Sequence, residues 1–314
     1  MQERRASMDL PLQKPILVTG SHRSGSTWVG NMLSIPPTIA YVNEPFNINY
    51  HPGTPRPHFE YWYTYVCDEN EILHTKYIQD CLTYRPHILK NTLKYGSMKD
   101  VKKQLWYQGR MLKARRTRKR PLMKDPLAVL SVEWLEKTFD MEVVILIRHP
   151  AAFVGSIKNA HWDHPFDHFL QQPLLMERYL SEFESEIARF AETKQNLVDQ
   201  AILLWNIIYS MVLKYQTNHE QNWIFIKHEQ ISEDPLLEFK KLYQQLEIPF
   251  TDHVYKRIRE FSFVKPEDQD SLRRDSKTVI KNWQKRLTKN EIARVKEKTE
   301  RIASQYYSDE DWKF

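Results

Sequence analysis

The sequence Pro15-Ile-Leu-Val-Thr-Gly-Ser-His-Arg-Ser-Gly-Ser-Thr-Trp-Val-Gly-Asn-Met-Leu33 decides the fold that we expect. Residues 16–18 form a short apolar run, which is typical of a parallel strand covered on both faces, and Gly20 ends it where the backbone must turn sharply. From Gly20 to Thr27 the spacing is G-x-x-x-x-G-S-T, a Walker A pattern with Ser26 in place of the lysine. The stretch therefore predicts a buried strand, a phosphate loop and a helix.

The chemistry of such a loop comes mainly from its backbone. Successive N–H groups and the positive end of the following helix form a cavity for an anion, and Gly25 lets the backbone approach the ligand. Ser26 and Thr27 add hydroxyl donors, and Arg23 adds a permanent positive charge that suits an anion bound without a metal. The missing lysine argues against an ordinary ATPase. A Ser/Gly-rich turn that merely caps a helix is the structural alternative.

The stretch Arg23-Ser-Gly-Ser-Thr-Trp28 resembles the 5′-phosphosulfate loop of sulfotransferases, the enzymes that use 3′-phosphoadenosine 5′-phosphosulfate (PAPS). The Arg-Ser-Gly-Ser-Thr form is most similar to the carbohydrate-directed and bacterial members. The resemblance implies that the loop holds the 5′-phosphate and the sulfuryl group, and that an aromatic ring at position 28 stacks on the adenine. The donor-binding residues it implies here are Arg23, Ser24, Gly25, Ser26, Thr27 and Trp28.

Chain length and net charge limit the classes of protein to which this sequence can belong. A chain of 314 residues can bury a substantial core as one large α/β domain, so we expect a flexible N-terminus over residues 1–14 and a single domain over residues 15–314. Lys and Arg total 46 against 40 for Asp and Glu, which gives a net charge of +6. That mild excess suits an anionic ligand and is too small to indicate nucleic acid.

Cysteine content and hydropathy indicate the compartment. Cys67 and Cys81 are the only cysteines, too few for a disulfide scaffold, and reduced thiols are the default in a cytoplasmic protein. Residues 1–12 lack the apolar core of a signal peptide or anchor, and the apolar run over residues 201–213 is too short for a bilayer. Carbohydrate-directed sulfotransferases normally carry an N-terminal anchor, so we expect a cytoplasmic, bacterial-type relative with no membrane span.

A second strand is predicted over residues 38–42, and it leads into Asn43-Glu44-Pro45-Phe46. A carboxylate at the carboxyl edge of a strand beside a phosphate loop lies where α/β folds bind ligands. Carbohydrate sulfotransferases have a similar Tyr-x-Glu-Pro pattern, and this resemblance implies that Glu44 removes the acceptor proton. A Glu that caps a turn or pairs with Arg23 is the alternative.

The sequence Pro121-Leu-Met-Lys-Asp-Pro126 resembles the third sheet strand of the family. Soluble sulfotransferases carry a Lys-x-His pattern here, whose lysine and histidine serve in catalysis. This chain has Lys124 and Asp125 but no histidine at that place, which strengthens Glu44 as the base. The resemblance implies that Lys124 contacts the transferring group and leaves Asp125 as the second candidate base. With Arg23, these residues form the predicted catalytic set.

The clearest buried strand covers residues 143–147 and ends at Arg148-His-Pro150, with Ser156 eight residues after the arginine. An Arg at the carboxyl end of a strand and a Ser on the adjoining helix converge on one anion. This pair resembles the 3′-phosphate site of sulfotransferases, which distinguishes PAPS from ATP-type nucleotides. An arginine that satisfies helix carbonyls is the alternative.

The C-terminal third gives weaker signals. His228-Glu-Gln resembles the family's Tyr-Glu-Asp segment, with His228 in the place of the tyrosine, and we interpret His228 as structural. Arg273-Arg-Asp-Ser-Lys277 resembles the basic loop that closes over the 3′-phosphate, although the glycine-rich core of that loop is absent. From it we take Arg274, Ser276 and Lys277 as further donor-binding candidates.

Three segments bear on the acceptor. Residues 46–65 are rich in aromatic rings with polar edges, among them Tyr50, which suits a sugar or phenol. Residues 113–120 hold six basic residues in eight, either a solvated helix face or an attraction for an acidic acceptor or the donor. Residues 161–168 place His and Asp at spacings that resemble a metal site, but Pro165 interrupts them, and we expect an acceptor contact or a plain loop.

The sequence therefore predicts a three-layer α/β/α, P-loop-like fold around a parallel sheet of about four or five strands. The predicted reaction moves a sulfuryl group from PAPS, without a metal, to a hydroxyl or amine of a small-molecule or glycan acceptor. Two alternatives from other classes are a P-loop nucleotide kinase, which needs Mg²⁺ and the loop lysine, and a non-catalytic nucleotide-binding module. The acceptor and the oligomeric state are beyond what the sequence predicts.

Overall fold

The computed structural model describes residues 11, 13–49, 51–55, 57–85, 97–219, 222–263, 276–277 and 280–313. The chain divides into two compact units. The N-terminal unit comprises Met1–Thr19 and Ser34–Val144, and the C-terminal unit comprises Gly20–Leu33 and Ile145–Phe314. One domain over residues 15–314 stays a prediction, and the predicted flexible N-terminus falls almost wholly outside the described residues.

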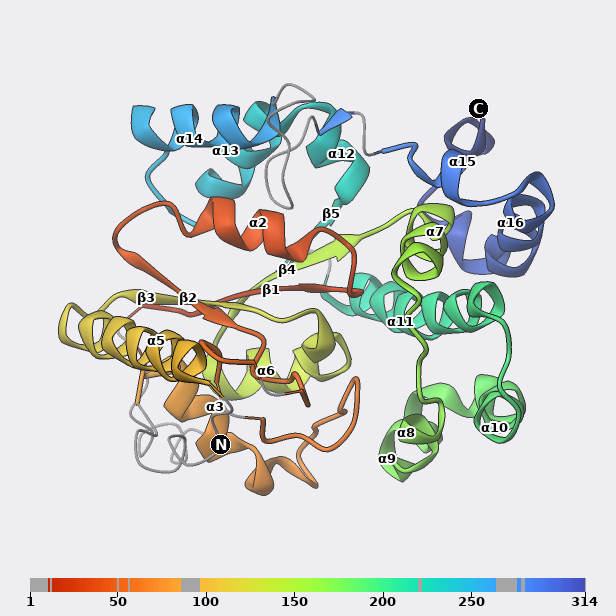
Figure 1. Ribbon diagram of the computed structural model, residues 1–314, viewed down its shortest axis with the longest axis horizontal. Helices are drawn as coiled ribbons and strands as arrows, with labels where there is room; N and C mark the ends of the chain where they lie inside the picture. The colour runs from red at the N-terminus through yellow and green to blue at the C-terminus, as the bar shows by residue number, and fades with distance from the viewer. Residues whose placement is uncertain are drawn as a thin grey trace. The chain divides into compact units, whose positions relative to one another are not determined.

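A five-stranded sheet in the order β2-β3-β1-β4-β5 is the centre of the fold (Figure 1). This confirms the predicted α/β class and the upper of the two predicted strand numbers. The strands are β1 (Ile16–Gly20), β2 (Ile39–Asn43), β3 (Arg120–Lys124), β4 (Glu142–Ile147) and β5 (Ile224–Lys227). They are short and nearly continuous in apolar residues, as strands of a parallel sheet with both faces covered must be.

The register explains why polar side chains gather at one edge of the sheet in the N-terminal unit. Strand β3 runs parallel to β1 and β2, with Lys124 opposite both Val18 and Asn43. Carboxyl ends of parallel strands lie at the same edge, which is the edge where such sheets bind ligands. Every residue of β1 and β3 is buried, Lys124 included, so its ammonium group needs a partner.

The N-terminal unit adds helices to this part of the sheet: η1 (Glu71–Leu73), α3 (Thr75–Leu82), α5 (Met98–Arg116), η3 (Pro126–Ser131) and α6 (Val132–Phe139). Ala40 and Val42 of β2 form a buried cluster with Met111 and Ala114 of α5, and Cys81 packs against it. Cys67 and Cys81 are not joined by a disulfide. The basic residues at the end of α5 are exposed, which fits a solvated helix face.

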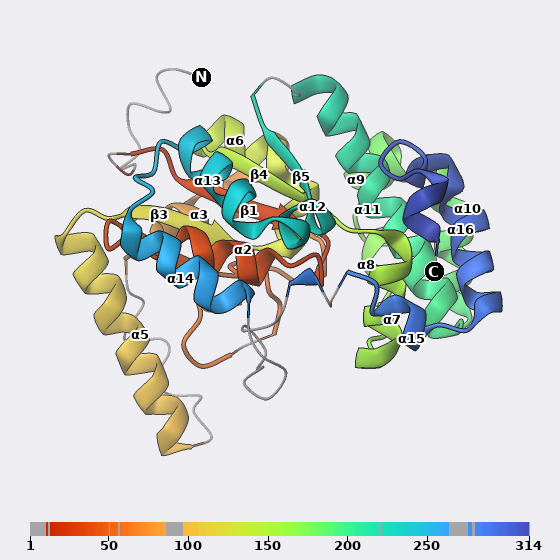
Figure 2. The ribbon, with the colours of Figure 1, turned by 90° about the horizontal axis from the view of Figure 1, so that it is seen from above.

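The C-terminal unit holds most of the helices. They are α2 (Ser26–Leu33), α7 (Pro150–Ala160), α8 (Asp167–Leu170), α9 (Pro173–Leu175), η4 (Met176–Leu180), η5 (Ser181–Phe183), α10 (Glu184–Glu192), α11 (Leu197–His219), α12 (His228–Glu233), α13 (Pro235–Gln245), α14 (Asp252–Ser262), α15 (Trp283–Arg286), α16 (Lys289–Ala303) and η8 (Asp309–Trp312). Helices α7 and α16 both pack on α11, and α13 and α14 pack on α2 (Figure 2). Tyr243 of α13 donates a hydrogen bond to the carbonyl of Met32 at 2.6 Å.

Helix α11 is the core helix of the C-terminal unit. By length and composition it is the one helix among the described residues that could cross a membrane, and 72% of its most apolar window is buried. Its central residues, such as Trp205, Ile208 and Tyr209, are fully enclosed by the unit. Burial of this kind is what a core helix requires.

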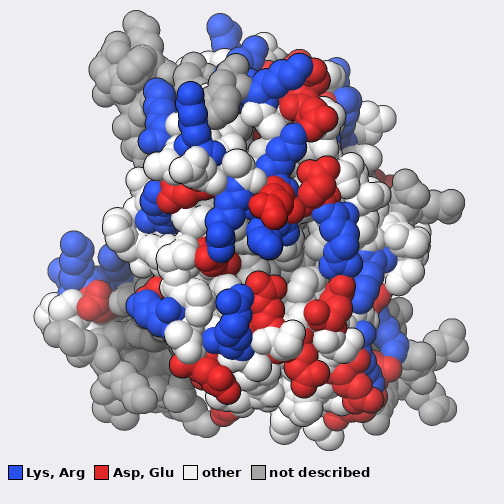
Figure 3. All heavy atoms as spheres, turned by 90° about the vertical axis from the view of Figure 1, so that its right-hand side faces the viewer, with Lys and Arg blue, Asp and Glu red and all other residues white. Residues whose placement is uncertain are grey.

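The chain before α11 is broken into short helices, namely α9, η4, η5 and α10. No Gly or Pro marks the break near Leu180, which is buried, so tertiary packing decides it. Helix α16 ends at Ala303, and charges of both signs cover this face of the C-terminal unit (Figure 3). Arg294 of α16, for example, pairs with Asp199 of α11 at 2.6 Å.

Candidate functional site

The phosphate loop of the C-terminal unit depends on unusual backbone angles. Gly20 (φ 139°), Arg23 (φ 63°) and Gly25 (φ 92°) all have positive φ, a region that favours glycine. A Cβ on Gly20 would lie 2.5 Å from the carbonyl oxygen of Leu146, and a Cβ on Gly25 would lie 2.4 Å from Nδ1 of His228. Helix α2 then begins at Ser26, so its first N–H groups lie within the predicted anion site.

Arg23 is held from two sides. Its Nε donates to Oγ of Ser156 on α7 at 2.9 Å, and its guanidinium carbon lies 5.4 Å from the centre of the Trp162 ring. The side chain therefore links a residue of the predicted 5′ site to a residue of the predicted 3′ site. The structure brings Arg23 and Ser156 together without a ligand, as two members of one cluster.

The other loop residues divide by exposure. Ser24 and Ser26 are buried, and the hydroxyl of Ser24 has no hydrogen-bond partner among the described residues. Thr27 is exposed at the start of α2. The half-buried ring of Trp28 meets Phe239 edge-on at 5.3 Å between centroids, so part of it is already packed against α13.

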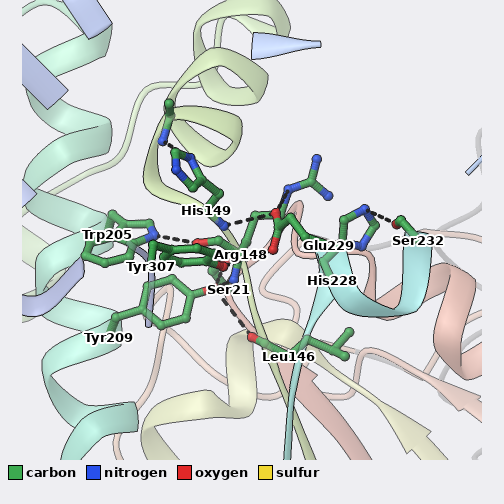
Figure 4. A network of polar contacts seen from close by, with 11 residues as sticks. Ser21, Leu146, Arg148, His149, Trp205, Tyr209, His228, Glu229, Ser232 and Tyr307 are labelled. Atoms are coloured by element: carbon green, nitrogen blue, oxygen red, sulfur yellow. Dashed lines mark hydrogen bonds and ion pairs between the residues drawn. The ribbon is translucent and has the colours of Figure 1, made fainter. Parts of the chain in front are cut away.

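Arg148 emerges at the end of β4 and is fixed through its backbone (Figure 4). Its N–H donates to the hydroxyl of Tyr209 at 2.9 Å, and its carbonyl accepts a hydrogen bond from Nε1 of Trp205 at 2.9 Å. Its Nε lies 3.6 Å from Oε1 of Glu229, and only 11% of the Arg148 side chain is exposed. A largely buried guanidinium with one carboxylate partner is suited to a second anion.

Glu229 of α12 connects this arginine to the end of the chain. Its Oε1 accepts the backbone N–H of His149 at 3.2 Å, and its Oε2 accepts the hydroxyl of Tyr307 at 2.9 Å. These two groups fix a carboxylate that faces Arg148 (Figure 4). Nothing in the local sequence indicates a role for Glu229, because its partners come from distant segments.

Tyr209 is the second residue that sequence reasoning missed. Its side chain is fully buried in α11, and its hydroxyl lies 2.9 Å from Oγ of Ser21 in the phosphate loop. The same hydroxyl donates to the carbonyl of Leu146 at 3.4 Å. On the sequence this residue was one more large side chain in an apolar helix, with no signal of a polar contact.

His228 has structural contacts, and the predicted C-terminal basic loop is described only at Ser276 and Lys277. His228 is buried against Gly25, and its Nε2 lies 3.2 Å from Oγ of Ser232. Burial, with Arg148 as a second cause, keeps the pKa of His228 well below its usual value, so the ring is neutral. Ser276 is buried and donates to the carbonyl of Ser232 at 2.7 Å, which uses its hydroxyl. Lys277 is exposed, and Arg274 lies outside the described residues.

Glu44 and Lys124 form the polar cluster of the N-terminal unit. Glu44 follows β2 with a positive φ of 48°, and its N–H donates to the carbonyl of Lys124 at 2.9 Å. Its carboxylate forms an ion pair with Nζ of Lys124 and accepts a hydrogen bond from Asn47 at 2.9 Å. Glu44 keeps 23% of its side chain exposed, whereas Lys124 keeps 2%. Glu44 is thus the solvent-facing member of the pair.

Asp125 has a different environment. It is fully buried, and its two oxygens accept the backbone N–H groups of Phe46 at 2.6 Å and Leu127 at 3.0 Å. Burial, followed by repulsion from Glu44, raises the pKa of Asp125 to about 7. With both oxygens occupied by backbone donors, Asp125 fixes the start of η3 and the turn after Glu44, and we retain Glu44 as the predicted base.

The aromatic segment after Glu44 is partly core. Phe46 and Phe59 are buried and stack with centroids 4.0 Å apart, and Tyr63 and Tyr65 are also buried. Tyr61 and Trp62 are half-buried, and Tyr50 lies outside the described residues. An acceptor wall over residues 46–65 stays a prediction for the partly exposed rings. In the described part of the chain no group of three or more His, Cys, Asp or Glu side chains has the placement to hold a metal.

A family model described as the sulfotransferase family matches residues 15–252, from just before β1 to the first residue of α14. The match covers well over half of the chain and includes the loop, Glu44, Lys124 and Arg148. The chain belongs to the sulfotransferase family. The resemblance seen in the Arg23–Trp28 stretch is thereby confirmed at the level of the family.

Solved sulfotransferase structures share this fold at low identity. The sulfotransferase domain of the Synechococcus PCC 7002 olefin synthase has a TM-score of 0.50 and 16% identity, covering 96% of this chain and 99% of its own. The sulfotransferase domain from the curacin biosynthetic pathway has a TM-score of 0.49 and 16% identity, covering 94% and 98%. Mouse sulfotransferase SULT7A1, solved in complex with PAP, has a TM-score of 0.45 and 13% identity, covering 95% and 91%. A search of curated proteins found no match.

Proposed function

We propose that this sulfotransferase uses PAPS as its donor and moves the sulfuryl group to a hydroxyl or amine of a small-molecule or glycan acceptor. The observation that carries the proposal is the hydrogen bond of 2.9 Å between Arg23 and Ser156. It joins the phosphate loop to the helix that follows Arg148, within one compact unit. A nucleotide with phosphates at both its 5′ and 3′ positions needs two anion sites in one cluster, and an ATP-type nucleotide does not.

The residues of the C-terminal unit fit such a donor. The loop offers backbone N–H groups at a helix start, and the hydroxyl of Ser24 is buried without a partner among the described side chains. Arg148 offers a guanidinium whose carboxylate partner contacts Nε. PAPS supplies the activated sulfuryl group when bound. The protein's part in that step is to hold the two phosphate ends and to place positive charge from Arg23 where charge builds on the leaving oxygen.

Glu44 is the proposed base. The acceptor oxygen or nitrogen forms a bond to sulfur, the bond from sulfur to the bridging phosphate oxygen breaks, and the acceptor proton passes to the carboxylate of Glu44. Lys124 is ion-paired with Glu44 and would hold that carboxylate in one orientation.

The experiment that tests the donor is calorimetry with adenosine 3′,5′-bisphosphate and ADP in the presence of EDTA. We expect metal-free binding with a strong preference for the 3′-phosphorylated nucleotide. Equal binding, or binding that requires Mg²⁺, would overturn the assignment of PAPS. A positive result makes an acceptor screen with PAPS the next step.

The same measurement separates the alternatives. A P-loop kinase would need Mg²⁺, and Ser26 stands where its loop lysine would be. A non-catalytic module would keep the preference for the bisphosphate but transfer no sulfuryl group to any acceptor. The ion pair of Glu44 with Lys124, which keeps part of the carboxylate in contact with solvent, favours the enzyme over the module.

A further inference from the structure

The hydroxyl of Tyr209 meets two parts of the C-terminal unit that the proposed function uses separately. It lies 2.9 Å from Oγ of Ser21, which is the second residue of the phosphate-loop motif. It also accepts the backbone N–H of Arg148 at 2.9 Å. One buried atom on a core helix therefore contacts both the loop and the strand end that carries the arginine (Figure 4).

The hydrogen-bonding capacity of this hydroxyl is completely used. A tyrosine hydroxyl has one proton and accepts two hydrogen bonds. Here the proton goes to the carbonyl of Leu146 at 3.4 Å, and the oxygen accepts from Arg148 and from Ser21. Burial raises the pKa of Tyr209, so the group stays protonated and the arrangement does not change with pH in the ordinary range.

Ser21 connects the hydroxyl of Tyr209 to the turn of the phosphate loop. Its carbonyl accepts the N–H of Ser24 at 3.1 Å, which closes the turn, and its hydroxyl is the group that reaches Tyr209. On the other side, Tyr209 fixes the peptide of Arg148 while Trp205, one turn earlier on α11, fixes the carbonyl of the same residue at 2.9 Å. The two side chains hold the end of β4 in one position relative to α11.

We propose that Tyr209 is a positioning residue that sets the spacing between the phosphate loop and Arg148, so that both phosphates of one donor nucleotide are bound together. The inference rests on the proposed function, and it adds a residue to which the sequence gives no role. Two sites on one rigid frame bind a two-ended ligand more tightly than either site binds a one-ended ligand, because the second contact is intramolecular. Tyr209 would supply that rigidity rather than touch the nucleotide.

The test compares three nucleotides on wild-type protein and on Tyr209→Phe by calorimetry. The nucleotides are adenosine 3′,5′-bisphosphate, adenosine 5′-monophosphate and adenosine 3′-monophosphate. We expect the variant to bind the bisphosphate at least about tenfold more weakly, because it loses all three hydrogen bonds of the hydroxyl and leaves the N–H of Arg148 without this acceptor. Each monophosphate should change by less than about threefold, because a single site can shift with its ligand.

Tyr243→Phe is the matched control. Tyr243 is also a buried tyrosine of the C-terminal unit, and its hydroxyl also donates to a backbone carbonyl, that of Met32 at 2.6 Å. It should lower the melting temperature, although by less than Tyr209→Phe because it removes one of the described hydrogen bonds rather than three, and it should leave the ratio of bisphosphate to monophosphate affinity unchanged. A purely structural role for Tyr209 would give the same result as this control and would overturn the proposal.

A double-mutant cycle with Ser21→Ala sharpens the test. If Tyr209 acts through Ser21, the double variant should bind the bisphosphate no more than about threefold more weakly than Tyr209→Phe alone. If the losses of affinity in the two single variants multiply in the double variant, Tyr209 does not act through its contact with Ser21. Wild-type protein that binds all three nucleotides equally would instead refute the PAPS assignment, and this inference with it.

Discussion

The proposed donor site of the C-terminal unit and the Glu44 cluster of the N-terminal unit are built in different ways. The proposed donor site is mostly backbone, held by a buried network in which Tyr209, Glu229 and Tyr307 fix other groups. The Glu44 cluster is one ion pair between two side chains, held in place by a hydrogen bond from Asn47. Backbone N–H groups bind any phosphate in the same way, whatever side chains surround them. A pair of side chains such as Glu44 and Lys124 can instead change by substitution.

This difference explains which part of the proposed function could be predicted from the sequence. Phosphate binding by a loop needs glycine at positions with positive φ, and that need leaves a pattern in the sequence. Acceptor binding needs only suitable rings and polar groups, which look the same whether they are core or surface. In the segment after Glu44 the structure divides them, since Phe46 and Phe59 are core while Tyr61 and Trp62 keep exposed area.

The largest expected effect separates the two sites by function. Glu44→Gln should lower turnover by about 10²–10⁴-fold, because the amide cannot take the acceptor proton, while affinity for adenosine 3′,5′-bisphosphate is retained. Steady-state kinetics and calorimetry on the same preparation measure both. Glu69→Gln, on the exposed surface of the same unit and outside the predicted acceptor segment, is the control. Unchanged turnover in Glu44→Gln would move the role of base to Asp125.

The second prediction concerns the donor site alone. Arg148→Ala should reduce the preference for the 3′-phosphorylated nucleotide by about 10–100-fold, because hydrogen bonds to charged groups contribute about 1.5–3 kcal/mol. A competition experiment between the bisphosphate and adenosine 5′-monophosphate measures the ratio of their affinities directly. Arg294→Ala, which removes an exposed arginine paired with Asp199, should leave it unchanged. If both nucleotides lose affinity equally, Arg148 does not read the 3′-phosphate.

The third prediction tests how the loop depends on its neighbour. Gly25→Ala should destabilise the protein by roughly 1–2 kcal/mol through its positive φ, and further through the clash with His228. In a His228→Ala background the same substitution should cost less, because the clash is gone while the backbone strain remains. Urea unfolding of the four proteins measures this coupling. An equal cost in both backgrounds would mean that the histidine ring moves aside freely.

The fourth prediction concerns the pH dependence of stability that Asp125 causes. Its pKa is raised to about 7 from the usual 3.8, so between about pH 4 and pH 7 the folded chain holds a proton that the unfolded chain has lost. The contribution of this group to stability therefore falls as the pH rises through that window, by at most about 1.4 kcal/mol per pH unit. Asp125→Asn should flatten the pH dependence of the free energy of unfolding. Glu44→Gln should flatten it partly, because it removes a repelling charge.

Much of the fold followed from local pattern. The apolar runs before Gly20 and Arg148 are strands β1 and β4, and the strand before Glu44 is β2, shifted by one residue. The break of the helix at Leu180 had no local cause and could not be predicted. The hydroxyl of Ser276 donates to the carbonyl of Ser232, a contact between segments far apart in the chain that no local pattern indicates, and its role in donor binding stays a prediction.

By itself the sequence determined the strand, loop and helix around Gly25, the arginine at the end of β4 and the sulfotransferase family, because each depends on residues close together in the chain. Tertiary structure alone decided that Glu44 pairs with Lys124, that backbone donors occupy Asp125, and that Tyr209 joins Ser21 to Arg148. The physical reason is that burial leaves every polar atom in need of a partner, and only the folded chain determines which distant group supplies it.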